Sequence, residues 1–176
     1  MATTKHTIVA LVEDKPGVLN RVSSLFRRRS FNIESIAVGH SEVPRLSRMT
    51  IVVDGATTAV EQVRKQLDKL VGVVRVVDIT SENITTRELA LIKVKANQQT
   101  RSGIIEIVDI FRANIVDVAI DSVTIEVTGD EEKIDSLINL LSTYGIKEVA
   151  RTGRIAMTRG STSLMQKEER GTKAQK

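Results

Sequence analysis

The residues best suited to binding a small ligand lie in the turn Glu13-Asp14-Lys15-Pro16-Gly17, directly after the apolar run Ile8 to Val12. A helix is expected to begin after this turn, and a helix N-terminus presents unpaired N–H groups and a positive dipole end. Those groups suit a carboxylate. Gly17 has no Cβ, so a ligand can approach its backbone closely. Pro16 loses nothing there by lacking an N–H group.

Two further side chains extend this hypothesis. Asp14 could accept hydrogen bonds from an ammonium group, and Asn32 offers both a donor and an acceptor. Together with the turn they match the head group of an α-amino acid, whose apolar side chain would need a small pocket of Val, Ile or Leu. Equally, Asp14 could simply cap the helix and Pro-Gly could simply form the turn. The residues alone leave both interpretations open.

No other residues form a catalytic or metal-binding pattern. The two histidines, His6 and His40, are isolated, and the chain has no cysteine. No glycine-rich phosphate-binding loop and no nucleophile elbow occurs. Glu34 and Asp117 lie on expected strands without an evident partner. The sequence therefore predicts neither catalytic residues nor a metal site.

The composition indicates an ordinary globular chain whose core is built from Val, Ile and Leu. Of its 176 residues 41% are hydrophobic but only 2% aromatic, which favours β-strands. The start, residues 1–6, lacks the apolar core of a signal peptide, and no apolar run approaches the roughly 20 residues that span a bilayer. We expect a soluble, cytoplasmic protein. The net charge of +4 is small for a dedicated nucleic-acid binder.

The hydrophobic periodicity predicts an α+β fold of two tandem ferredoxin-like βαββαβ modules. In each module the order is strand, helix, strand, strand, helix, strand. The expected elements of the first module are residues 8–12, 18–26, 32–38, 49–53, 60–70 and 73–79. After a break at about 81–86 follow 89–94, 104–111, 115–120, 123–127, 134–141 and 146–150, with a last short strand at 155–157. The predicted domains are 5–80, 86–159 and a flexible polar tail, 160–176.

Several strands carry apolar residues at consecutive positions, as in Val73-Val74 and Val76-Val77. Both faces of such a sheet need burial. Either the two modules cover each other within one chain, or two chains associate. We expect an obligate oligomer.

The stretch Leu11 to Leu19, followed by Asn32-Ile33, resembles the ACT domain, a βαββαβ module that commonly binds amino acids between two copies. Three further stretches resemble the acetolactate synthase (acetohydroxyacid synthase) small-subunit family: Phe31 to Val38, Leu46 to Val53, and Glu148 to Gly153 with Arg159-Gly160. The resemblance covers about residues 5 to 160.

The resemblance implies a regulatory subunit with no catalytic site and no cofactor of its own. Its expected partners are a second copy of itself and a catalytic subunit that carries thiamine diphosphate, Mg²⁺ and FAD. It would activate that subunit and confer feedback inhibition by valine or a related branched-chain amino acid. The family's effector site lies across the dimer interface, and its residues map onto Asp14, Lys15, Pro16, Gly17, Val18 and Leu19, with Asn32 and Ile33.

One position departs from the family pattern, and two other functions remain open. Ser30 stands where the family often has Gly, and a left-handed residue there would cost about 1 kcal/mol. A stand-alone ACT regulator of another enzyme is one alternative. RNA binding, suggested by the basic run Arg27-Arg28-Arg29, is the other, but the strands lack aromatic residues for stacking bases.

Overall fold

The computed structural model describes residues 4–161, which form two compact units. One unit contains the chain up to Thr85 together with the residues from Ala156 onward, and the other spans Thr86–Ile155. The predicted polar tail lies outside the described residues from position 162. Among the described residues no helix is long and apolar enough to cross a membrane.

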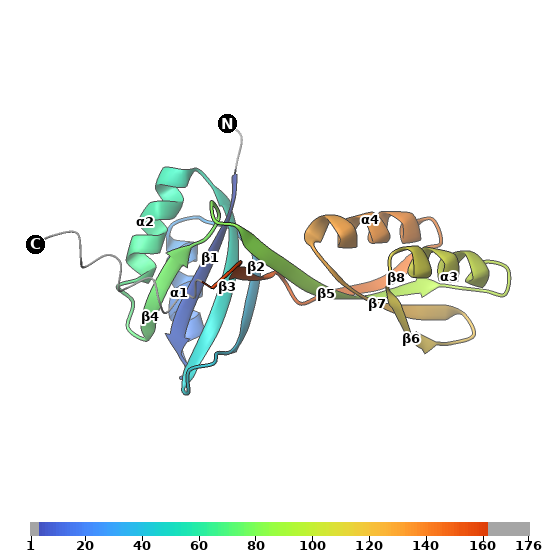
Figure 1. Ribbon diagram of the computed structural model, residues 1–176, viewed down its shortest axis with the longest axis horizontal. Helices are drawn as coiled ribbons and strands as arrows, with labels where there is room; N and C mark the ends of the chain where they lie inside the picture. Colours follow the sequence, from blue (N-terminus) through green and yellow to red (C-terminus); the bar gives the residue numbers. More distant parts are fainter. Residues whose placement is uncertain (1–3, 162–176) are drawn as a thin grey trace, which may run out of the picture. The chain divides into compact units, whose positions relative to one another are not determined.

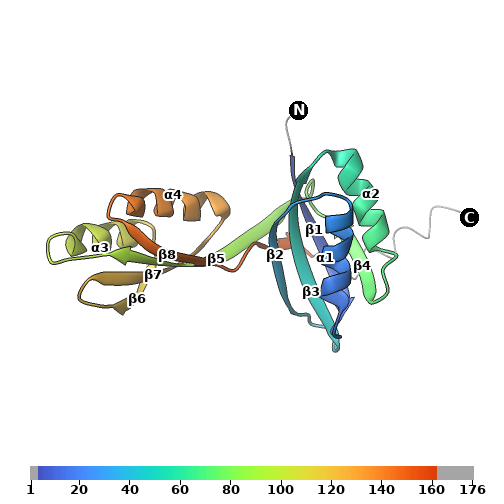
Figure 2. The ribbon, with the colours of Figure 1, turned by 180° about the vertical axis from the view of Figure 1, so that it is seen from behind.

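The first unit has the predicted βαββαβ order. Its elements are β1 (Thr4–Glu13), α1 (Val18–Arg28), β2 (Ile33–His40), β3 (Leu46–Gly55), α2 (Thr57–Leu67) and β4 (Val73–Asp78). The strands form an antiparallel sheet in the order β2-β3-β1-β4, so β2 and β4 are its edges. Both helices lie on one face of this sheet (Figures 1 and 2). Their apolar stripes and alternate strand residues make the main core, which includes Ile8, Val22, Phe26, Ile51 and Val60.

The opposite face of this sheet is partly covered by the same unit. Val9 packs there with Ile79 and with Ala156, which comes from the end of the described chain. The backbone carbonyl of Ala156 also accepts a hydrogen bond from Arg48 Nη2 at 2.8 Å. Burial of the Arg48 guanidinium lowers its pKa from the usual value, with a smaller opposing effect of Glu42.

The second unit repeats the order. Its elements are β5 (Ile84–Lys95), whose first two residues belong to the first unit, α3 (Arg101–Ile110), β6 (Asn114–Val118), β7 (Ser122–Gly129), α4 (Glu131–Ser142) and β8 (Ile146–Arg151). The short β9 (Ile155–Thr158) follows, and all of it after Ile155 belongs to the first unit. The sheet order is β6-β7-β5-β8, with β9 paired to β5. The predicted fold of two ferredoxin-like modules is therefore confirmed. The predicted break begins as expected, but β5 starts already at Ile84, whose side chain packs against Val9 and Ile79.

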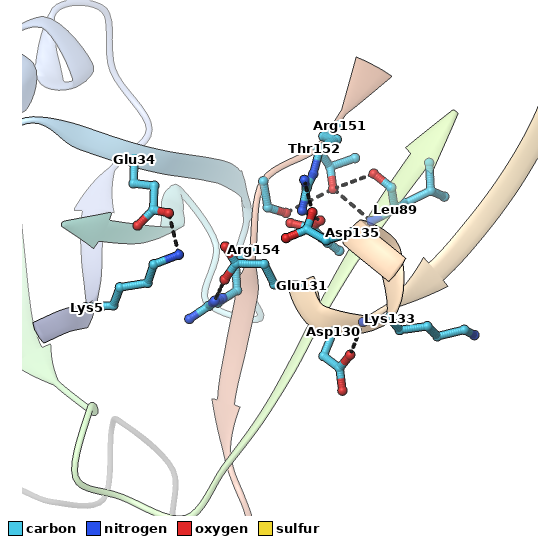
Figure 3. A network of polar contacts seen from close by, with 12 residues as sticks. Lys5, Glu34, Leu89, Asp130, Glu131, Lys133, Asp135, Arg151, Thr152 and Arg154 are labelled. Carbon is cyan, nitrogen blue, oxygen red and sulfur yellow. Dashed lines mark hydrogen bonds and ion pairs between the residues drawn. The ribbon is translucent and has the colours of Figure 1, made fainter. Parts of the chain in front are cut away.

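A cluster of ion pairs fastens β8 to the rest of the second unit (Figure 3). Arg151 on β8 pairs with Glu88 on β5, and its Nη1 lies 2.7 Å from Asp135 Oδ1 on α4. Glu88 is only 7% exposed, so Arg151 supplies the countercharge that a buried carboxylate needs.

The end of α1 confirms the expectation for Ser30, which has a left-handed φ of 56°. The N–H of Ser30 bonds to the carbonyl of Arg27, and the N–H of Phe31 bonds to that of Phe26, each at 3.1 Å. This is the Schellman pattern, whose left-handed position usually holds Gly. Ser30 therefore occupies a conformation that costs a non-glycine residue about 1–2 kcal/mol.

Candidate functional site

The turn between β1 and α1 is held in place by two neighbouring loops. The N–H of Glu13 donates to the Gly72 carbonyl at 2.7 Å, and the N–H of Asp14 donates to the Arg45 carbonyl at 2.9 Å. Arg45 itself has a positive φ of 65°. The backbone of the turn is thus fixed by main-chain contacts, and its side chains are left for other purposes.

The start of α1 carries no side-chain cap. Gly17 occupies the N-cap position with φ 86° and ψ −9°, which only glycine adopts readily, and no acidic residue lies in the first turn. The capping role considered for Asp14 is therefore absent. Its carboxylate instead lies 3.4 Å from His40 Nδ1. A helix start without a side-chain acceptor suits an external anion.

A guanidinium group lies beside this helix start. Arg21 Nη2 is 3.9 Å from the point that a Cβ would occupy at Gly17. Arg21 is exposed and lies one helical turn beyond the N-cap. Its charge adds to the positive end of the helix dipole, so the electrostatics here favour a carboxylate.

The remaining predicted residues of the turn differ in what they can offer a ligand. Val18 is buried in the core, so only its backbone can reach the surface. Leu19 is 49% exposed and presents an apolar side chain beside the turn. Lys15 is exposed and its ammonium lies 3.2 Å from a carboxylate oxygen of Glu13. Pro16 is exposed as well.

Asn32 and Ile33 lie at the other end of the unit from the turn. Ile33 pairs with Val53, which pairs with His6 near the start of β1. The 11 residues of α1 separate that end from Gly17, a length of about 16 Å at the usual rise per residue. A single chain therefore does not bring Asn32 to the turn. Asn32 is exposed, and Ile33 is partly buried against the core.

Sequence reasoning missed four contributors to this site: Arg21, His40, Arg45 and Gly72. The carbonyl of Gly72 accepts from the N–H of Glu13, although the two residues are far apart in the sequence. Helical spacing places Arg21 one turn after Gly17, and this signal could have found it. No sequence pattern indicated His40 or Arg45, because their contacts with Asp14 depend on the pairing of β2 with β3.

Within residues 4–161 no group of three or more His, Asp or Glu side chains is placed to hold a metal ion. His6 is buried, and its Nδ1 lies 3.2 Å from Asp78 Oδ2. The β1–α1 turn offers an uncapped helix start and a neighbouring guanidinium group, which suit an anion.

Comparison with known proteins finds similarity along nearly the whole described chain. A family model described as the AHAS small subunit-like ACT domain matches residues 8–75, and one described as the small subunit of acetolactate synthase matches residues 87–160. The chain belongs to the acetolactate synthase small-subunit family. Members of this family are regulatory, non-catalytic subunits.

Individual relatives extend the match over their full length. The probable acetolactate synthase small subunit of Archaeoglobus fulgidus is 58% identical over 157 residues, which is 89% of this chain and 98% of that protein. The acetolactate synthase small subunit of Bacillus subtilis is 50% identical over 158 residues, 89% and 92% of the two chains. The crystal structure of the small subunit from Thermotoga maritima is similar with a TM-score of 0.83 and 45% identity, and covers 90% of this chain and 99% of that one.

Proposed function

We propose that the chain binds valine, or a related branched-chain amino acid, between the first units of two copies and thereby regulates a catalytic acetolactate synthase subunit. Membership of the small-subunit family supports the regulatory role. The uncapped start of α1 beside Arg21 is the observation that supports the binding of an amino acid there. The catalytic subunit would hold the thiamine diphosphate, Mg²⁺ and FAD.

The position of β2 at the sheet edge supports a site shared by two copies. An edge strand has unpaired backbone groups that can pair with another strand. If two β2 strands pair antiparallel about their midpoint, the start of one strand lies beside the end of the other. Asn32 of the second copy then lies near His40 of the first, and His40 contacts Asp14. The homodimer completes the site that one chain leaves open.

Each group of the ligand has a complementary group in this arrangement. The carboxylate accepts from the N–H groups at the start of α1 and is attracted by Arg21. Asp14 and the amide of Asn32 from the second copy receive the ammonium group. The exposed part of Leu19 offers an apolar contact for a branched side chain.

Regulation follows if the ligand prefers one dimer geometry over another. A ligand shifts such an equilibrium only by its difference in affinity for the two states. A coupling free energy of about 1–3 kcal/mol changes the affinity or activity of a partner roughly 5- to 150-fold. The catalytic subunit is activated by the free dimer and inhibited when valine stabilises the other geometry.

Isothermal titration calorimetry of the purified chain with valine, leucine and isoleucine tests the proposal. Arg21→Gln should weaken binding about tenfold because it removes one nearby charge. Arg28→Gln is the matched control, since it removes the same charge from the last turn of the same helix. Asn32→Ala should also weaken binding, whereas Asn114→Ala, at the corresponding strand start of the second unit, should not.

Light scattering after size-exclusion chromatography tests the dimer. A stable monomer that binds valine with full affinity would contradict the shared site. Unchanged valine affinity in both Arg21→Gln and Asn32→Ala would contradict the assigned residues. If none of the three amino acids binds, with or without the catalytic subunit, the proposal is wrong.

A further inference from the structure

The second unit contains a cavity of about 300 Å³ that the proposed function does not use. It lies between the loop that joins β5 to α3, the turn between β6 and β7, and the turn between α4 and β8. Its polar lining consists of Lys95, Asn97, Thr100, Asp121, Tyr144 and Lys147. All of these residues belong to the second unit, so the cavity is complete within it.

The charges around this cavity leave one cation available. Lys147 pairs with Asp121, and that hydrogen bond lowers the pKa of the Asp121 carboxyl, which therefore stays ionised. Lys95 pairs with no carboxylate among residues 4–161, whereas its neighbour Lys93 pairs with Glu148. The three charges of the lining sum to one positive charge, which favours a single negative charge inside.

The Lys95 side chain is positioned by a glycine. Its Cδ lies 3.2 Å from the point that a Cβ would occupy at Gly145, so the apolar stem passes over this residue. Gly145 has a φ of 95°, which disfavours any other residue there. The outer part of the Lys95 stem therefore packs on the backbone of Gly145 at the edge of the cavity that Lys95 lines.

Tyr144 supplies a hydroxyl group at the same cavity. Its Oη is 2.7 Å from the point that a Cβ would occupy at Gly103, so the absence of a side chain on α3 makes room for it. Asn97 Oδ1 accepts from the N–H groups of Gln99 and Thr100 at 2.9 Å, but Thr100, the N-cap of α3, makes no side-chain cap bond, so the first turn of α3 is uncapped like that of α1. Lys95 and Tyr144 are lining residues with side-chain groups that can donate to a ligand here, beside the uncapped start of α3.

We propose that this cavity binds a small singly charged anion, a carboxylate or inorganic phosphate, with Lys95 as its countercharge and Tyr144 as a hydrogen-bond donor. The cavity occupies the place in the second module that the β1–α1 turn occupies in the first, between the first strand and the first helix. Its chemistry differs in that a lysine of the first strand, Lys95, lines it in addition to the uncapped start of the helix. It does not depend on valine binding in the first unit.

The composition of the chain provides a direct reporter for this site. Tyr144 is the only tyrosine and there is no tryptophan, so the intrinsic fluorescence of the full chain reports on the cavity. We would titrate the chain with sodium acetate and, separately, with sodium phosphate, and hold the ionic strength constant with sodium chloride. A saturable change in Tyr144 emission in the millimolar range is expected with at least one of them.

Two lysine variants distinguish a site from general electrostatics. Lys95→Gln should raise the apparent Kd about tenfold, since it removes the unpaired charge nearest the ligand. Lys69→Gln removes the same charge from an exposed position in the first unit and should leave the Kd unchanged. Saturation by acetate alone identifies a carboxylate site, and saturation by phosphate alone a phosphate site.

The proposal is overturned if neither anion gives a saturable change, or if the two variants have equal effects. Calorimetric titration of the Lys95→Gln variant with valine separates this outcome from a failure of the proposed function. Valine affinity should be that of the unmodified chain, because the cavity and the β1–α1 turn belong to different units.

Discussion

The turn between β1 and α1 depends on a glycine from a different part of the chain, and this dependence can be tested by Gly72→Ala. Gly72 follows α2 and has a φ of 89°. Its carbonyl accepts the Glu13 N–H, and a Cβ there would lie 2.9 Å from Val18 Cγ2. A contact that short requires Val18, the first residue of α1, to move.

The cost of this substitution has three parts. The left-handed conformation costs a non-glycine residue about 1–2 kcal/mol. Overpacking against Val18 adds roughly 1–3 kcal/mol. Alanine also reduces the conformational entropy of the unfolded chain, which stabilises the folded state by about 0.4–1 kcal/mol. We therefore expect Gly72→Ala to lower the free energy of unfolding by about 3 kcal/mol, within the wide range that these three contributions allow.

Gly17→Ala is the matched comparison, because Gly17 has a similar left-handed φ but its added Cβ would make no short contact. Gly17 has a φ of 86°, but the nearest atom to its added Cβ would be Arg21 Nη2 at an ordinary 3.9 Å. Only the conformational cost and the entropy gain apply, and the expected loss is about 1 kcal/mol or less.

Urea unfolding followed by far-ultraviolet circular dichroism measures both losses of stability. An unchanged slope of the unfolding free energy against urea concentration shows that the same transition is compared. Gly72→Ala should also weaken valine binding, because moving Val18 displaces the start of α1. If Gly17→Ala destabilises the chain as much as Gly72→Ala does, the contact with Val18 is not the cause and the reasoning fails.

Three further changes test other parts of the structure. Ser30→Gly should stabilise the chain by roughly 0.5–1 kcal/mol in urea unfolding, because it removes left-handed strain at the end of α1, and a loss of stability would contradict this. Arg151→Ala should lower the free energy of unfolding by roughly 2–4 kcal/mol, because it leaves Glu88 buried and unpaired. Adding Glu88→Gln should recover much of that loss. A loss below about 1 kcal/mol would show that water satisfies the carboxylate. The Lys147 hydrogen bond lowers the pKa of Asp121 below its usual 3.8, so its stabilisation is present above that pH and lost as pH falls through the lowered value. The Asp121→Asn variant should therefore lose less stability on acidification than the parent chain, and an identical acid profile would contradict the assignment.

Local sequence patterns were sufficient to predict most of the fold. Alternating or consecutive β-branched residues predicted each strand, because a half-buried pleated sheet selects such side chains. The 3.6-residue spacing of Val18, Val22, Leu25 and Phe26 predicted α1. These four side chains are all buried in the structure. Strand ends were less accurate, and β5 begins before its predicted start, since Ile84 is held by contacts with residues distant in the sequence.

The sequence by itself determined the order of helices and strands in each module. It also determined the left-handed backbone positions at Gly17 and Ser30. Each of these features depends on residues close together in the chain. Only the tertiary structure showed that Asp14 contacts His40 rather than capping α1, and that Asn32 lies a helix length away from Gly17. Strand pairing and sheet order decide those distances, and they arise from the packing of the whole unit. The sequence therefore named the residues of the candidate site, whereas the distance between Asn32 and the β1–α1 turn within one chain was decided by the tertiary structure.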